Sequence, residues 1–171
     1  LFVRDAWNLT PADDEFGQVS GSSAVFIPTF DEELEVLEPT LMAAMKIRGA
    51  KEVWLLDDGR RNWVRDLAIE YGAKYLARSS NEHAKAGNIN AVLPKLKGDL
   101  ILVLDADHVP SPDFLEATTG YFADPKIALI QTAHSFRNHN SVMHEEEGRH
   151  EQSLFFDVLL PGRNRLKSVF W

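Results

Sequence analysis

Residues 100–110 read LILVLDADHVP, and this stretch decides both the fold class and the place of the candidate site. Leu100 to Leu104 form an unbroken apolar run, which is typical of a parallel strand buried on both faces. Asp105 and Asp107 follow at once, and residues two apart in an extended chain point the same way. Because open α/β sheets bind ligands at the carboxyl ends of their strands, the pair predicts a site for a hard divalent cation, Mg²⁺ or Mn²⁺. By itself the D-x-D spacing is weak, since a strand end followed by a turn also uses these residues.

The composition is that of an ordinary globular domain. The chain has 171 residues, of which 44% are hydrophobic and 26% charged, so there is room for one domain with a substantial core. A net charge of −8 argues against a nucleic-acid-binding protein, which normally carries a basic face. No apolar run has the length of a membrane-spanning helix, so we expect a soluble chain. The absence of cysteine excludes disulfides and thiolate metal sites.

The two ends suggest a piece of a longer protein. Residue 1 is Leu rather than Met, and the chain stops within an apolar run, Ser168 to Trp171. Residues 1–22 mix Trp, Pro, Asp, Gly and Ser without a period, which predicts a linker or surface strap. We therefore expect one domain over residues 23–171 that is truncated at its C-terminus.

Strand and helix patterns alternate between residues 24 and 131. The expected strands cover residues 24–27, 53–56, 74–77, 100–104 and 127–130. The expected helices carry apolar stripes at Leu34, Leu37, Leu41 and Met45, at Trp63, Leu67 and Tyr71, at Ile89, Val92, Leu93 and Leu96, and at Phe114, Thr118, Tyr121 and Phe122. Pro39 favours a start of the first helix close to it, and Gly72 suits the C-cap of the second. This alternation predicts an α/β fold, a mostly parallel sheet with helices on both faces.

Four of the expected strands end in polar segments, at residues 28–32, 57–59, 105–108 and 131–134. In a parallel sheet these ends lie along one edge, so the segments predict a binding cleft there.

A fifth segment, His83-Ala-Lys85-Ala-Gly87-Asn88, adds the opposite charge. It leads into a helix N-terminus, where backbone N–H groups and the helix dipole favour an anion. Alone it is better explained as an N-cap beside a surface lysine. Next to the carboxylate pair, it predicts a diphosphate site in which the metal ion and Lys85 neutralise the same group.

Other catalytic patterns are absent from the sequence. There is no G-x-G-x-x-G after a strand, no P-loop and no G-x-S-x-G elbow. His144-Glu145 lacks a histidine at the zincin spacing, because residue 148 is Gly. We expect the later histidines (His134, His139, His144 and His150) to be surface or supporting residues and not a metal cluster.

The motifs together resemble family 2 glycosyltransferases, and within them the catalytic domain of bacterial cellulose synthases. The resemblance covers roughly residues 24–171 and rests on residues 25–32 (VFIPTFDE), 56–61 (LDDGRR), 83–90 (HAKAGNIN), 105–108 (DADH) and 131–136 (QTAHSF). The one departure is Asp31, where the family usually has Asn. The resemblance implies the GT-A fold, which binds nucleotide sugars.

The resemblance also implies roles for single residues. Thr29, Glu32 and Asp57 would hold the uridine end of UDP-glucose, with Asp58 near the donor. Lys85 would contact the diphosphate, and Asp105, Asp107 and His108 would hold Mg²⁺ or Mn²⁺. Gln131 and His134 would lie near the sugar or the acceptor glucan.

The implied reaction is inverting transfer of glucose from UDP-glucose to a growing β-1,4-glucan. In the family an Asp of a T-E-D motif is the general base and a Q-x-x-R-W motif clamps the acceptor; this chain contains neither. We therefore expect the base beyond Trp171 and no polymerisation by this piece alone. The implied parent lies in the bacterial inner membrane with this domain facing the cytoplasm, and works with other synthase subunits. Two alternatives stay open: a family 2 polysaccharide synthase with another sugar or linkage, and a non-catalytic nucleotide-binding module.

Overall fold

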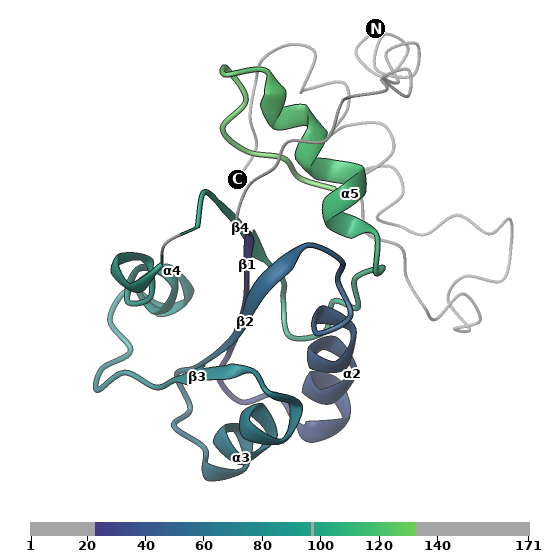
Figure 1. Cartoon of the computed structure of the whole chain (residues 1–171). Helices are drawn as coiled ribbons and strands as arrows, with labels where there is room; N and C mark the ends of the chain where they lie inside the picture. Colours follow the sequence, from purple (N-terminus) through teal and green to yellow (C-terminus); the bar gives the residue numbers. More distant parts are fainter. Residues whose placement is uncertain (1–22, 97, 133–171) are drawn as a thin grey trace, which may run out of the picture. The chain divides into compact units, whose positions relative to one another are not determined.

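The computed structural model describes residues 23–96 and 98–132, and its centre is a four-stranded parallel sheet (Figure 1). The strands are β1 (Ser23–Thr29), β2 (Ala50–Asp57), β3 (Lys74–Leu76) and β4 (Leu100–Val103), in the order β3-β2-β1-β4. Every neighbouring pair is parallel, so all carboxyl ends lie along one edge. The sheet belongs to a compact unit of residues 17–127, whereas residues 128–132 group with a second unit.

Strand β1 lies inside the sheet, between β2 and β4, and every one of its residues is buried. Strand β1 extends beyond the expected residues 24–27, since Pro28 lies within it and pairs with Leu56 of β2. Proline is tolerated here because β4 leaves the sheet first: the last bond on that side runs from the Leu104 N–H to the Phe26 carbonyl (2.9 Å).

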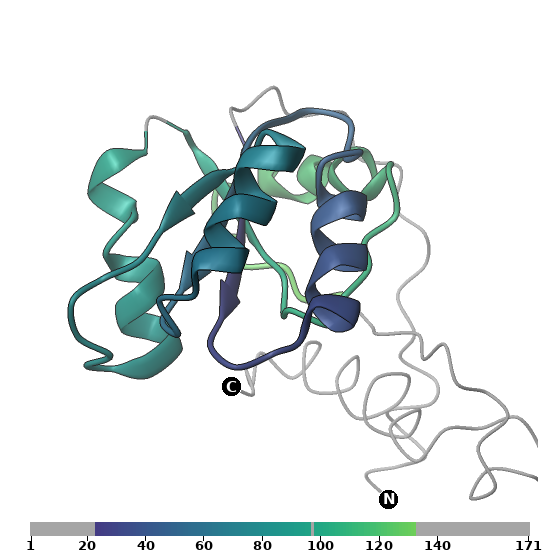
Figure 2. The same cartoon turned by 90° about the horizontal axis from the view of Figure 1, so that it is seen from below.

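Helices cover both faces of the sheet, as Figures 1 and 2 show. Helices α2 (Leu34–Ala44) and α3 (Asn62–Tyr71) pack on one face through a core that includes Val25, Leu41, Leu55 and Val64. Helix α4 (Ala84–Asn90) and the 3₁₀ turn η1 (Leu93–Lys95) cover the other face, where Val92 packs with Phe26, Trp54 and Leu56. Helix α5 (Phe114–Thr118) and the 3₁₀ segment η2 (Thr119–Ala123) follow β4. The predicted α/β class is confirmed.

Two strand predictions need correction. Strand β4 is not buried on both faces: it is an edge of the described sheet, and Ile101 and Val103 are 41% and 39% exposed. Residues 127–130 are irregular and form no strand. The Ile127 N–H closes a turn on the Asp124 carbonyl, and Leu129 is exposed, so this apolar run has no partner strand in residues 23–96 and 98–132.

Over residues 23–96 and 98–132 a helix lies near each of the four predicted apolar stripes, but the details partly differ from the predictions. Helix α2 begins at Leu34 with Pro39 inside it, not near Pro39. Helix α3 ends as predicted at a left-handed Gly72, but it buries Val64, Leu67 and Ala68 and leaves Trp63 37% exposed. The helix expected from Ile89 to Leu96 begins earlier, as α4, and breaks before η1. None of the helices described over residues 23–132 is long and apolar enough to cross a membrane.

Candidate functional site

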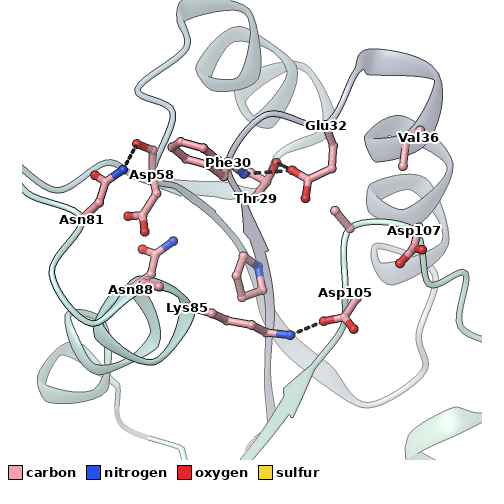
Figure 3. A pocket seen from close by; sticks show the side chains of 13 residues that line it. Thr29, Phe30, Glu32, Val36, Asp58, Asn81, Lys85, Asn88, Asp105 and Asp107 are labelled. Atoms are coloured by element: carbon pink, nitrogen blue, oxygen red, sulfur yellow. Dashed lines mark hydrogen bonds and ion pairs between the residues drawn. The ribbon is translucent and has the colours of Figure 1, made fainter.

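A pocket of about 610 Å³ opens at the carboxyl edge of the sheet (Figure 3). Its walls come from the ends of β1, β2 and β4, from helices α2 and α4, and from the segment before α4. The lining residues are Pro28, Thr29, Phe30, Glu32, Val36, Asp58, Asn81, Ala84, Lys85, Asn88, Asp105, Ala106 and Asp107. Three of the four polar segments predicted to converge therefore do so, together with the segment that carries Lys85.

Asp105, Asp107 and His108 form a group that suits a metal ion. One ligand atom from each residue lies within 4.8 Å of the others, and the His108 Nε2 is 3.7 Å from a carboxylate oxygen of Asp107 and 3.9 Å from one of Asp105. The His108 N–H donates to the Asp105 carbonyl (3.0 Å), which closes the turn that brings the three together. Two carboxylates and an imidazole are hard or borderline ligands of the kind that divalent cations prefer.

Lys85 faces this group across the pocket (Figure 3). Its ammonium forms an ion pair with the Asp105 carboxylate, although both side chains are about half exposed. At this part of the pocket Lys85 therefore lies beside the group formed by Asp105, Asp107 and His108. Such an arrangement can take a diphosphate together with the cation that the phosphate oxygens share.

Thr29 and Glu32 form the wall at the end of β1. The Thr29 hydroxyl donates to Glu32 Oε2 (2.6 Å), and the Phe30 N–H donates to the same oxygen (2.9 Å). Partial burial raises the pKa of Glu32, but these two hydrogen bonds and the nearby Arg61 outweigh it and hold the pKa below its ordinary value. Glu32 is therefore an anionic hydrogen-bond acceptor at neutral pH.

Asp57 lies behind the pocket wall and does not line it. Its carboxylate is fully buried and accepts from the backbone N–H groups of Gly59 (2.9 Å) and Arg61 (2.6 Å), from Arg61 Nε (3.1 Å) and from the Tyr75 hydroxyl (3.1 Å). Burial, followed by the charge of Asp57, raises the pKa of Tyr75 to about 12. Gly59 is needed in this turn, because a Cβ there would stand 2.2 Å from the Phe30 carbonyl oxygen.

Asp58 does line the pocket, and it is held from behind by Arg78. The guanidinium donates from Nε to Asp58 Oδ1 (2.6 Å) and from Nη2 to Oδ2 (2.7 Å), a two-point pairing that raises the pKa of Arg78. The Asn81 amide donates to the Asp58 carbonyl (3.1 Å).

The sequence interpretation missed Arg61, Arg78 and Asn81. A signal was available, because a carboxylate at the end of a buried strand needs a hydrogen-bonded partner. The two arginines follow the expected second and third strands within a few residues.

Asn88 is the most buried polar residue of the pocket lining, at 1% exposed. Its amide nitrogen donates to the Leu56 carbonyl (2.7 Å) and ties α4 to the end of β2. It therefore fixes where Lys85, one turn earlier in α4, stands.

Two predicted site residues, Gln131 and His134, are not tested by this arrangement. Gln131 is exposed in the irregular segment 128–132, so its predicted contact with sugar or acceptor stays a prediction. His134 lies outside the described residues, as do His139, His144 and His150.

Comparison with known proteins gives a consistent result. A sequence model of glycosyl transferase family 2 matches residues 24–167. The chain is 39% identical over 171 residues to cellulose synthase 1 of Komagataeibacter xylinus, covering 95% of this chain and 11% of that protein. It is 40% identical over 161 residues to a UDP-forming cellulose synthase catalytic subunit of Xanthomonas axonopodis pv. citri, covering 86% of this chain and 21% of that protein.

Among solved structures, a mannosyltransferase of Pyrobaculum calidifontis, determined in complex with GDP-Man and Mn²⁺, superposes with a TM-score of 0.61. The two share 19% identity, and the match covers 74% of this chain and 40% of the other. This likeness shows the predicted nucleotide-sugar transferase fold.

Proposed function

The chain belongs to glycosyl transferase family 2, and from that premise we propose that it binds the sugar donor of a longer cellulose synthase. The donor is UDP-glucose, and the whole protein transfers its glucose to a growing β-1,4-glucan. The names of the relatives support this substrate, at 39% and 40% identity. The chain spans only 11% and 21% of those relatives, so the transfer itself is assigned to the longer protein.

The observation that carries the proposal is the division of charge in the pocket. Four carboxylates line it, and two of them are already tied to this chain's own donors: Glu32 to Thr29 and Phe30, and Asp58 to Arg78. Asp105 and Asp107 lie with His108 opposite Lys85, whose ammonium pairs with Asp105. An acidic pair with one lysine opposite is the arrangement that a cation and an anionic diphosphate complete together.

The fit to a divalent cation rests on this donor set. Asp105, Asp107 and His108 would hold it, with Mg²⁺ and Mn²⁺ both suitable for oxygen-rich ligands. When bound, the ion neutralises charge on the diphosphate leaving group. The mannosyltransferase with the same fold was solved with Mn²⁺, which supports a metal here as well.

The chain's own residues bind and orient the donor. Lys85 leaves Asp105 to contact the diphosphate, and the Thr29–Glu32 wall accepts hydrogen bonds from the uridine end. Asp57 does not line the pocket and stabilises the turn after β2 by accepting its backbone hydrogen bonds. The carboxylate of Asp58 lies next to the bound sugar nucleotide. Gln131 and His134 are proposed near the sugar or the acceptor. No residue of this chain is assigned to remove the acceptor's proton.

Two further parts of the proposal concern the longer protein. One relative is named a catalytic subunit, which supports other synthase subunits as partners. A β-glucan as the acceptor, and a position in the bacterial inner membrane with this domain on the cytoplasmic side, follow from the cellulose synthase assignment.

Calorimetry of UDP binding tests the proposal. UDP should bind the chain with Mn²⁺ present and at least about tenfold more weakly without it, because the ion neutralises both the diphosphate and the carboxylate pair. Asp105→Asn should remove the metal dependence, while Asp66→Asn, on an exposed carboxylate of α3, should leave it unchanged. Equal binding with and without Mn²⁺ in all three proteins would contradict the metal site. Tighter competition by GDP than by UDP would contradict the uridine assignment.

A further inference from the structure

Arg78 connects parts of the pocket that are far apart in the sequence. Its side chain is only 14% exposed, although it lies in the segment between β3 and α4. Besides its two bonds to Asp58, it donates from Nη1 to the Glu82 carbonyl (2.5 Å) and from Nη2 to the Ala84 carbonyl (2.8 Å). One guanidinium thus joins the turn after β2 to the turn that precedes Lys85.

The turn that Arg78 holds has an unfavourable backbone conformation. His83 and Ala84 have φ values of 60° and 43°, in the left-handed region that residues with a Cβ rarely adopt. The two carbonyls bound by Arg78 belong to Glu82 and Ala84, directly before and within this pair. Such a conformation persists only where surrounding contacts enforce it, and Arg78 supplies two of these contacts.

Gly87 makes room for this arrangement. A Cβ at position 87 would stand 2.1 Å from the Glu82 carbonyl oxygen and 2.4 Å from Arg78 Nη1. The first contact is with backbone, which cannot swing away as a side chain can. The close packing of α4, the turn and the guanidinium therefore depends on glycine here, even though glycine weakens a helix.

A second layer supports the same segment. Arg60 donates to the Asn81 side chain (2.7 Å), and Asn81 in turn donates to the Asp58 carbonyl (3.1 Å). None of these residues belongs to the two apolar core clusters. The network joins the segment before α4 to the turn after β2 at the pocket wall.

From these contacts we propose that Arg78 is a positioning residue for the nucleotide diphosphate: it holds Asp58 and the turn carrying Lys85 in the relative placement that binding requires. Arg78 does not line the pocket itself, so it acts through those two residues. The inference rests on the proposed function, since it assumes that Lys85 and Asp58 contact the donor.

Binding of UDP with Mn²⁺ to the full 171-residue chain tests this. Arg78→Ala should weaken UDP binding at least about tenfold, because it releases the charge-assisted bonds to Asp58 and to the turn that precedes Lys85. Added guanidinium chloride, well below its denaturing range, should restore part of the lost affinity, whereas sodium chloride at equal ionic strength should not. Arg65→Ala, on an exposed arginine of α3, is the matched control and should bind UDP normally.

Two further variants keep the test decisive if Arg78→Ala does not fold. Arg78→Lys keeps the charge without the two-point geometry and should bind UDP several-fold more weakly. Gly87→Ala should also weaken binding, and guanidinium should not rescue it, because Arg78 is still present.

Each outcome has a distinct meaning. If the unmodified chain does not bind UDP, the proposed function fails and the inference falls with it. If the unmodified chain binds and Arg78→Ala or Arg78→Lys binds equally well, the inference alone is overturned. A loss of affinity that guanidinium does not rescue in Arg78→Ala would reduce Arg78 to a purely structural role and would also overturn it.

Discussion

Replacing Arg61, the N-cap of α3, with methionine should destabilise the fold far more than the same change at Arg65, four residues later in that helix. The Arg61 guanidinium is 16% exposed and pairs with the fully buried carboxylate of Asp57 (3.1 Å). It also donates from Nη1 to the Glu32 carbonyl and from Nη2 to the Thr29 hydroxyl (both 2.6 Å). Methionine keeps most of the apolar stem and removes the charge and the donors.

The size of the effect follows from what Asp57 retains. Removing one partner of a buried ion pair typically costs about 3–5 kcal/mol, because the other charge is left without compensation. Asp57 keeps three other donors: the Gly59 and Arg61 backbone N–H groups and the Tyr75 hydroxyl. We therefore expect the lower end of this range, about 3 kcal/mol of lost unfolding free energy.

The control has the same chemistry in a solvated setting. Arg65 pairs with Asp66, and the two side chains are 50% and 63% exposed. Such pairs contribute about 0–1 kcal/mol, so Arg65→Met should change the unfolding free energy by no more than that.

Urea denaturation followed by circular dichroism measures both variants, and an unchanged m-value ensures a fair comparison. Combining Arg61→Met with Asp57→Asn should cost less than the sum of the two single changes, because each removes the same interaction. Equal losses of stability in Arg61→Met and Arg65→Met would refute the stabilising role of the buried Arg61–Asp57 ion pair. Additive losses in the Arg61→Met, Asp57→Asn double variant would refute it as well.

Three further predictions concern single residues. The pKa of Tyr75 is raised to about 12 in the fold. The contribution of Tyr75 to stability is therefore complete below the ordinary tyrosine pKa of about 10 and is lost as the pH rises from there to about 12. Absorbance titration at alkaline pH should show a late phenolate step that Tyr75→Phe lacks. Asn88→Ala should cost about 1–3 kcal/mol in urea denaturation, since it leaves the Leu56 carbonyl without its 2.7 Å bond, and a smaller loss would show that water replaces the amide. Leu55→Ala, at a fully buried position, should cost about 2–5 kcal/mol, whereas Ile69→Ala, at a site 68% exposed, should cost under about 1 kcal/mol.

Much of the fold could be predicted because hydrophobic period reports local burial. The alternation of patterns located all four strands, and Gly72 correctly marked the end of α3. The period does not report which neighbours an element has. For that reason residues 100–104 were predicted to form a strand buried on both faces, although β4 lies at the edge of the described sheet. Residues 127–130 were likewise predicted to form a strand, although they are irregular in the described part of the chain.

The candidate site was predictable to the extent that strand ends share an edge. That rule brought Thr29, Glu32, Asp58 and Asp105 together correctly, and the basic segment added Lys85. It did not show that Asp57 turns away from the pocket, because in β2 consecutive side chains face opposite sides of the strand. It also could not pair Asp58 with Arg78, a contact across twenty positions that depends on how the segment before α4 folds back.

The arginines explain how an acidic pocket can accept an anion. A nucleotide diphosphate would be repelled by Glu32 and Asp58 if their charges were uncompensated, since unit charges 4 Å apart interact by about 4 kcal/mol near a protein surface. Arg78 pairs with Asp58, and Arg61, whose ion-pair partner is Asp57, also donates to Thr29, so both arginines reduce the negative field that a ligand meets at this wall. Asp105 forms its ion pair with Lys85 and lines the pocket together with Asp107. In the proposed complex Lys85 turns to the diphosphate and the cation takes its place beside Asp105, so that binding of metal and binding of nucleotide are linked through one lysine.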